Sequence, residues 1–401
     1  MIAAFRLFFR EWFYLLKRPR SLIILILIPI FVTGICGVSF ENGSFTHLKM
    51  GIVDYSYSAK TREVVDAFQQ SEYFDVIGYY ENEDQVETAM KDGEIVGCII
   101  FPADFTKNVM QGRQAQVLLG SCAVNMGYGS TINLRGAEIL GTLSTQMAVK
   151  GLVAKGYTVD DAVAKMNPVS FYIRQWYNPT NNFGYFLTFG FVIATLQQVL
   201  VYFAAISLAR EKESGKLGEI KGVNPIFQVI IKALVYYIIS MGVWMVCAWM
   251  MVNKFGIPMK GSFDVWFAYS SLFILSIIAM GQFFSAVMPN PVFATSVSLA
   301  FTSPSLVFSG FTWPTMAFTG FYQKLAQVFP LTHFVIGYRN VALIGCGFDA
   351  IREEMIGLAG ISGGCLFLSC VVWYIKLKLI EKKQQALETP VDQETAQAVA
   401  Q

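Results

Sequence analysis

Charged residues are scarce in this chain. Lys, Arg, Asp and Glu make up 14% of its 401 residues, whereas a soluble domain carries roughly 25%. Hydrophobic residues make up 54% of the chain, and the formal net charge is only +2. Much of the surface must therefore face something other than water, and no basic surface for nucleic acid is indicated.

Histidine is nearly absent, and the cysteines form no recognisable pattern. The chain has two histidines, His47 and His333, and seven scattered cysteines without a C-x-x-C pair. This excludes the usual spacing of a zinc site, so no metal is expected. Cys98 and Cys122 fall in the same hydrophilic segment and form either a disulfide or two free thiols, which the sequence leaves open.

A phosphate-binding loop is also missing. No G-x-x-x-x-G-K-S/T run occurs, and Gly215-Lys216 is followed by Leu217. With His47 the only histidine among the carboxylates of residues 41–182, no acid–base pair is evident. We therefore expect no enzyme and no cofactor in this chain. If the protein uses ATP with Mg²⁺, both bind to a separate subunit.

Long apolar runs take the place of these features. A helix needs about 20 apolar residues to cross the hydrocarbon core, and six windows qualify. The sequence predicts an α-helical integral membrane protein with six transmembrane helices and a small α/β extracytoplasmic domain inserted between helices 1 and 2. The predicted spans are Ser21–Phe40, Phe183–Leu208, Pro225–Val252, Val265–Val287, Val292–Pro314 and Met355–Ile375.

Positive charge predicts the orientation. Five Lys and Arg residues precede the first span, four follow the second and four follow the sixth, while the loops on the other side hold few. Because cytoplasmic loops are enriched in basic residues, we expect both termini in the cytoplasm and residues 41–182 outside. The first span is longer than the apolar part of a signal peptide and no cleavage site follows, so we expect it to be retained.

The first 18 residues predict an amphipathic helix in the membrane interface. Its apolar residues recur at helical spacing: Phe5, Phe8, Phe9, Trp12 and Leu16. Pro19 separates this helix from the first span. At the other end, residues 377–401 form a polar cytoplasmic tail that we expect to be disordered after Lys383.

Residues 48–155 alternate between strand-like and helix-like segments, which indicates a small α/β fold. The strands are expected at Met50–Val53, Phe74–Tyr79, Ile95–Phe101 and Gln116–Leu119. The helices are expected at Ala59–Gln70, Glu83–Lys91, Ala103–Met110 and Tyr128–Lys155.

Lys232 is the only ionisable residue inside a predicted span apart from tyrosine and cysteine. It lies within two turns of the predicted cytoplasmic end, from which its amine can reach the interface. Ion-coupled carriers usually need intramembrane charges as relays. Their scarcity disfavours an ion-driven carrier.

Three segments resemble the permease subunits of type 2 ABC exporters (the ABC-2 type). Arg210–Ile220 with Pro225 resembles the family's E-R-E-x-G-T-x-E-x-L run, with departures at Lys216 and Gly218. Gly93–Phe105 is similar to its pattern of a glycine, an apolar strand and P-x-x-F. Ser309–Pro314, followed by a glutamine, a P-L-T run and an arginine, resembles a pattern near the outer face.

The resemblance implies two six-helix permeases, identical or different, on two cytoplasmic ABC ATPase subunits. It implies that a segment over residues 209–224 transmits nucleotide-driven movement to the spans 183–376. The residues that match the motif or flank it are Arg210, Glu211, Lys212, Glu213, Gly215 and Glu219. The alternative for this segment is an ordinary basic loop.

The resemblance and the composition together predict that residues 315–348 form short helices that re-enter the outer leaflet and close an outer gate. Its marker residues are Gly310, Pro314, Gln323 and Pro330. In the second span, Gln197 and Gln198 either line a substrate path or bond to a neighbouring helix.

The sequence thus favours the membrane subunit of an ATP-driven exporter in a bacterial inner membrane. Its substrate would be hydrophobic or amphipathic, and the external domain would bind substrate or a periplasmic adaptor protein. The alternative is a membrane receptor or scaffold whose external domain holds a partner without transport.

Overall fold

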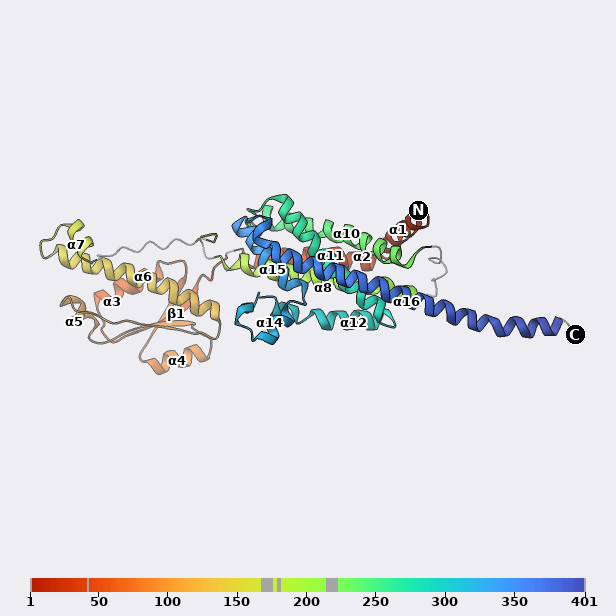
Figure 1. Cartoon of the computed structure of the whole chain (residues 1–401). Helices are drawn as coiled ribbons and strands as arrows, with labels where there is room; N and C mark the ends of the chain where they lie inside the picture. The colour runs from red at the N-terminus through yellow and green to blue at the C-terminus, as the bar shows by residue number, and fades with distance from the viewer. Residues whose placement is uncertain (1, 42, 167–175, 179–181, 214–222, 400–401) are drawn as a thin grey trace. The chain divides into compact units, whose positions relative to one another are not determined.

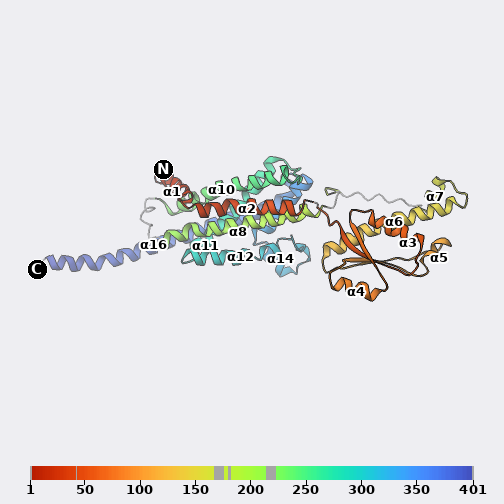
Figure 2. The ribbon, with the colours of Figure 1, turned by 180° about the vertical axis from the view of Figure 1, so that it is seen from behind.

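The computed structural model describes residues 2–41, 43–166, 176–178, 182–213 and 223–399. The chain divides into two units (Figures 1 and 2). One unit, which we call the helical unit, comprises residues 1–41 and 182–401, and the other, the α/β unit, comprises residues 42–181.

Six helices in the described part of the helical unit are long and apolar enough to cross a membrane, as predicted. They are α2 (Pro19–Ser39), α8 (Phe183–Glu213), α10 (Pro225–Asn253), α11 (Phe263–Val287), α12 (Pro291–Thr302) continued by α13 (Ser305–Phe308), and α16 (Arg352–Val399). Helix α1 (Ile2–Leu16) is separate from α2, and Pro19 stands at the first turn of α2, where its missing N–H costs nothing.

Helix α11 lies at the centre of this bundle and packs against α8, α10, α12 and α16 (Figure 1). Its inward face meets α15 (Pro330–Arg339), which is also buried. The rings of Phe273 and Phe334 stack there with centroids 3.9 Å apart. Trp244 of α10 joins them and donates a hydrogen bond to Ser270 Oγ at 2.9 Å. Buried aromatic groups of this kind supply much of a core's contact area.

The fifth span is shorter than predicted. It breaks at Ser303-Pro304, because Pro304 cannot continue the hydrogen-bond ladder of α12. It resumes as α13 and ends at Phe308, not at Pro314. Short pieces follow: η1 (Thr315–Ala317), α14 (Gly320–Ala326), α15, a π-helical turn η2 (Asn340–Ile344) and η3 (Phe348–Ile351).

The last helix is longer than predicted. Helix α16 continues to Val399 and extends past the other helices of its unit (Figure 2), so the expected disorder after Lys383 is wrong for the backbone. The segment after Lys383 is rich in Gln, Glu and Ala, which are good helix formers even without an apolar face.

The α/β unit holds a four-stranded sheet in the order β2-β1-β3-β4. The strands are β1 (Leu48–Asp54), β2 (Phe74–Tyr80), β3 (Gly97–Phe101) and β4 (Leu118–Ser121). β1 pairs in parallel with β2 and β3, and β4 runs antiparallel to β3. All five residues of β3 are buried, as expected for a strand covered on both faces.

Helices cover both faces of this sheet. They are α3 (Ala59–Gln69), α4 (Glu83–Lys91), α5 (Phe105–Met110) and α6 (Met126–Val153). Helix α7 (Val159–Met166) packs against α6. Phe68 of α3 and Ile132 of α6 pack on one face, and Val86 of α4 packs on the other. The predicted fold class, six spans with a small inserted α/β domain, is confirmed.

Gly190 in α8 makes a packing prediction for the helical unit. A Cβ atom added there would lie 1.9 Å from the ring of Phe311, which stacks on Phe186. Gly190→Ala should lower the free energy of unfolding by about 1–3 kcal/mol through overpacking. Gly242→Ala is the matched control, since a Cβ there meets no atom within 4 Å. Thermal unfolding in detergent compares the two, and equal melting temperatures would contradict the packing.

Candidate functional site

Five charged side chains meet at the end of the bundle where α1 lies. They come from three helices: Arg10 and Glu11 from α1, Arg210 and Glu211 from the last turns of α8, and Lys232 from α10. We call this group the charge cluster. It contains three cations and two carboxylates.

The two carboxylates are shared among the three cations. Lys232 Nζ lies 2.6 Å from Glu11 Oε1 and 2.8 Å from Glu211 Oε1. Arg10 Nη2 lies 2.6 Å from Glu211 Oε1 and 3.1 Å from Glu11 Oε1. Arg210 pairs with the other oxygen of Glu11, and its guanidinium lies 3.6 Å from the ring centroid of Tyr14. Glu11 therefore links α1 to α8 and α10, and Glu211 links α8 to α1 and α10.

The charge cluster is buried except for Arg10, whose side chain is 28% exposed. Lys232 is fully buried, Glu11 is 1% exposed and Glu211 is 4% exposed. The expectation that Lys232 extends to the interface is therefore wrong, because two carboxylates neutralise it where it stands. Burial alone would raise the pKa of Glu11, but the charges of Lys232 and Arg210 outweigh it and lower that pKa to about 2.

Helix α1 places Glu11 by its helical spacing. Leu7, Glu11 and Leu15 recur every four residues and are all buried. On its other face Phe5, Phe9 and Phe13 are exposed by 66%, 41% and 55%, which is the face a membrane interface would cover. The sequence interpretation found the aromatic face and missed the buried one. A single acid between two leucines, in an otherwise basic helix, was the available signal.

A second group of polar contacts lies at the carboxyl end of α11. Lys212 Nζ donates to the carbonyl oxygens of Ser285 at 3.0 Å and Met288 at 2.6 Å, and Lys376 of α16 donates to that of Val287. Cations suit this position because the last carbonyls of a helix are unpaired and carry partial negative charge. These lysines connect α8, α11 and α16.

Of the predicted coupling residues, the structure brings Arg210 and Glu211 into the charge cluster and Lys212 to the end of α11. Glu213 is the last residue of α8, and its side chain is outside the described part. Gly215 and Glu219 belong to residues 214–222, which also lie outside the described residues. Arg10, Glu11 and Lys232 complete the charge cluster and were not among the predicted residues.

The two glutamines of α8 bond to the neighbouring helices. Gln197 Nε2 donates to Ser305 Oγ at 2.6 Å, and Gln198 Oε1 accepts from Thr302 Oγ1 at 2.8 Å. Gln197 Oε1 is buried and has no hydrogen-bond partner among the described residues. The glutamines therefore connect α8 to the broken fifth span, one of the two alternatives for them.

The predicted outer segment has a defined conformation. Gly310 adopts φ +76°, and a Cβ there would lie 2.9 Å from Ile336 of α15, so a glycine is required. Pro314 precedes η1, and Gln323 Nε2 donates to Phe318 O at 3.0 Å. Pro330 opens α15 and is buried. These four residues therefore shape the chain between α13 and α15.

No catalytic constellation accompanies these features in the described residues. No group of three or more metal-ligating side chains is found there. His47 Nδ1 does lie 3.1 Å from Asp75 Oδ1, a pair that the sequence interpretation overlooked, but both side chains are exposed. All seven cysteines are free, including Cys98 and Cys122.

The fold and these contacts define a multi-pass membrane protein whose buried charges tie helices together. Residues 19–375 match the model of the ABC-2 family transporter protein. The chain therefore belongs to the ABC-2 transporter family, and it is the membrane subunit of an ABC transporter.

Relatives in Escherichia coli K12 cover nearly the same length. The chain is 24% identical to "Probable multidrug ABC transporter permease YbhS" over 84% of this chain and 87% of that protein. It is 21% identical to "Probable multidrug ABC transporter permease YbhR" over 85% and 90%, respectively. It is also 21% identical to "Inner membrane transport permease YhhJ" over 89% and 93%.

The charge cluster predicts that a single variant loses more stability than a double variant. Glu11→Leu leaves Arg10, Arg210 and Lys232 with one carboxylate, that of Glu211, which should cost about 3–5 kcal/mol of stability. The double variant Glu11→Leu/Lys232→Leu should cost less than Glu11→Leu alone, because it removes the uncompensated charge. Thermal unfolding measures both, with the exposed Glu353→Leu as control. A double variant less stable than Glu11→Leu would be inconsistent with the cluster.

Glu11 also predicts a pH dependence. Its pKa of about 2 in the folded protein is below the ordinary 4.5, so its stabilisation is present above pH 4.5 and is lost as the pH falls through 2. The shift corresponds to about 3 kcal/mol. The stability difference between wild type and Glu11→Gln should therefore shrink from pH 5 towards pH 2. A difference that does not change with pH would refute the pairing.

Proposed function

We propose that this protein is the permease of an ATP-driven exporter and that the charge cluster carries movement from an ABC ATPase into the spans. The observation that supports this most is the position of the cluster. Arg210 and Glu211 lie in the last turn of α8, which ends at Glu213 directly before residues 214–222. Lys232 lies in α10, which begins at Pro225 shortly after them, and it pairs with Glu211. A force on this connecting segment therefore acts on two spans that share ion pairs.

The proposed orientation follows from the basic residues. With both termini in the cytoplasm, the charge cluster and residues 209–224 face the cytoplasm, and residues 41–182 lie outside. A soluble ATPase would then contact the segment around Glu213, Gly215 and Glu219. Because Arg210 and Glu211 are buried and Lys212 is bonded to α11, it would act on these three residues through that segment. ATP and Mg²⁺ would bind to that subunit, and a second permease, identical or similar, would complete the transporter in the inner membrane.

The proposed cargo is hydrophobic or amphipathic, in keeping with the multidrug permeases among the relatives. We place its path along the contact between α8 and the broken fifth span, where Gln197 and Gln198 hold the two together. The break at Ser303-Pro304 offers a point at which this contact can open. Residues 315–348 would close the path on the outer side, with Gly310 and Pro330 setting their turn and helix start.

Reconstitution of the purified pair tests this proposal. With its ABC ATPase subunit in nanodiscs, the permease should raise the rate of ATP hydrolysis, and Glu213→Lys should reduce that effect by reversing a charge beside the segment. Glu381→Lys, the same change on an exposed residue of α16, should leave it intact. Pure permease that binds no ATPase, or that accumulates Hoechst 33342 in liposomes under an ion gradient alone, would contradict the proposal.

Glu211→Gln separates coupling from assembly. The substitution keeps the shape of the side chain but removes the charge that Lys232 and Arg10 share. We expect the ATPase subunit to co-purify in wild-type amount. ATP-dependent dye transport should fall, because the ion pair that makes α10 move together with α8 is lost. Transport and ATP hydrolysis that both stay at the wild-type level would exclude the cluster from coupling.

A further inference from the structure

The α/β unit contains a cleft that the transport proposal does not use. Its volume is about 740 Å³, and it lies between helix α6, the end of α7 and the stretch from α5 to β4. Ligand pockets commonly have volumes of 300–1,000 Å³. All of its lining residues belong to this one unit.

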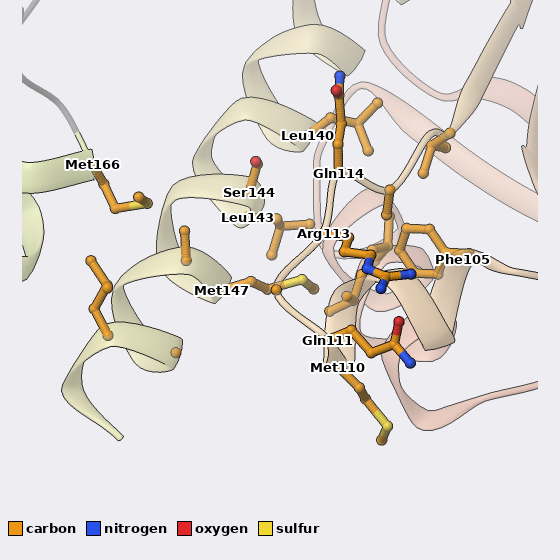
Figure 3. Close-up of a pocket in the computed structure, with 18 of the residues that line it drawn as sticks. Phe105, Met110, Gln111, Arg113, Gln114, Leu140, Leu143, Ser144, Met147 and Met166 are labelled. Carbon is orange, nitrogen blue, oxygen red and sulfur yellow. The ribbon is translucent and has the colours of Figure 1, made fainter. Parts of the chain in front are cut away.

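The cleft is lined mainly by apolar side chains. Val64 and Phe105, 2% and 4% exposed, form part of its buried lining. Leu143 and Met147 extend from α6 towards Phe105 and Arg113 (Figure 3). Three methionines, Met110, Met147 and Met166, contribute to the wall. Methionine side chains adapt to differently shaped apolar partners. The cleft can therefore accommodate apolar groups of different shapes.

Its charge has one sign. Arg113 and Lys155 are lining residues, and none of the lining residues is acidic. In the described part of the chain neither Arg113 nor Lys155 forms an ion pair. By contrast, Lys60 of α3 and Lys150 of α6 both pair with Glu63 of α3. An anionic group on a ligand would therefore meet two exposed cations that are not neutralised by a carboxylate of the described chain.

We propose that this cleft binds a small amphipathic molecule with an apolar body and an anionic head. The body would lie on Phe105, Leu143 and Met147, and the head would meet Arg113 and Lys155. The proposal concerns binding to the α/β unit and requires neither ATP nor transport, so it can fail while the exporter proposal stands.

The structure offers a steric test. Gly151 lines the cleft, and a Cβ atom added there meets nothing within 4 Å. Gly151→Leu therefore places a side chain in the cleft without a backbone clash. Gly141 lies in the same helix with the same free space but does not line the cleft. Gly141→Leu is thus a matched control for helix propensity and added surface.

The measurement uses two probes with one apolar body. 8-Anilinonaphthalene-1-sulfonate carries a sulfonate, and N-phenyl-1-naphthylamine lacks it. The full chain, with ¹³C-methyl methionine, is titrated in nanodiscs of neutral lipid while the methyl signals of Met147 and Met166 are followed. The buried Met50 and the exposed Met126 lie outside the cleft and serve as internal references.

We expect the sulfonate to shift the cleft methionines saturably and to bind about tenfold more tightly than the neutral probe, because charge-assisted contacts are the strong ones. Gly151→Leu should abolish the shifts and Gly141→Leu should not. Arg113→Gln/Lys155→Gln should lower the affinity to that of the neutral probe, whereas Lys107→Gln, exposed on α5, should have no effect.

Three outcomes would overturn the proposal. Equal affinity for the two probes would show that the cleft does not recognise an anionic head. Shifts that persist in Gly151→Leu would place the ligand elsewhere. Shifts that depend on the concentration of permease and not on the probe would show that a second copy occupies the cleft.

Discussion

Lys232 is the constraint around which one end of the helical unit is organised. It is the only Lys, Arg, Asp, Glu or His in α10, and it is fully buried. A buried charge is tolerated only with partners at hydrogen-bond distance, and Glu11 and Glu211 supply them. Because Glu11 belongs to α1, this helix must stay docked for Lys232 to remain neutralised, and α8 must stay beside α10 for the same reason.

This arrangement gives the end of the bundle a stiffness that apolar packing alone does not provide. Apolar helices in lipid slide past one another at small cost, since lipid tails are as apolar as leucine. Ion pairs join α1, α8 and α10, and Lys212 and Lys376 bond to the end of α11. These polar contacts limit such sliding. A group of helices held in this way can move as one body, as the proposed coupling to an ABC ATPase requires.

Hydrophobic periodicity was enough to predict the six spans and the order of strands and helices in the α/β unit, because both are set by local burial patterns. It could not predict Lys232 paired with Glu11, since the two residues are 221 positions apart and meet only through tertiary packing. The predicted end of the fifth span at Pro314 was wrong because the apolar run continues past Phe308, while the helix ends there, two residues before Gly310 with its positive φ. Helix α7 was missed because it is short and polar.

The most direct test of the role of the charge cluster is whether the distance between α1 and α10 stays constant during transport. Spin labels at Phe5→Cys and Phe227→Cys, both exposed positions, would report on that distance in a variant lacking the native cysteines and bound to its ATPase. A second pair, Phe227→Cys and Phe293→Cys, would report on movement between α10 and α12. We expect ATP to change the second distance and to leave the first unchanged, whereas a change in the first distance would show that the charge cluster does not hold these helices together.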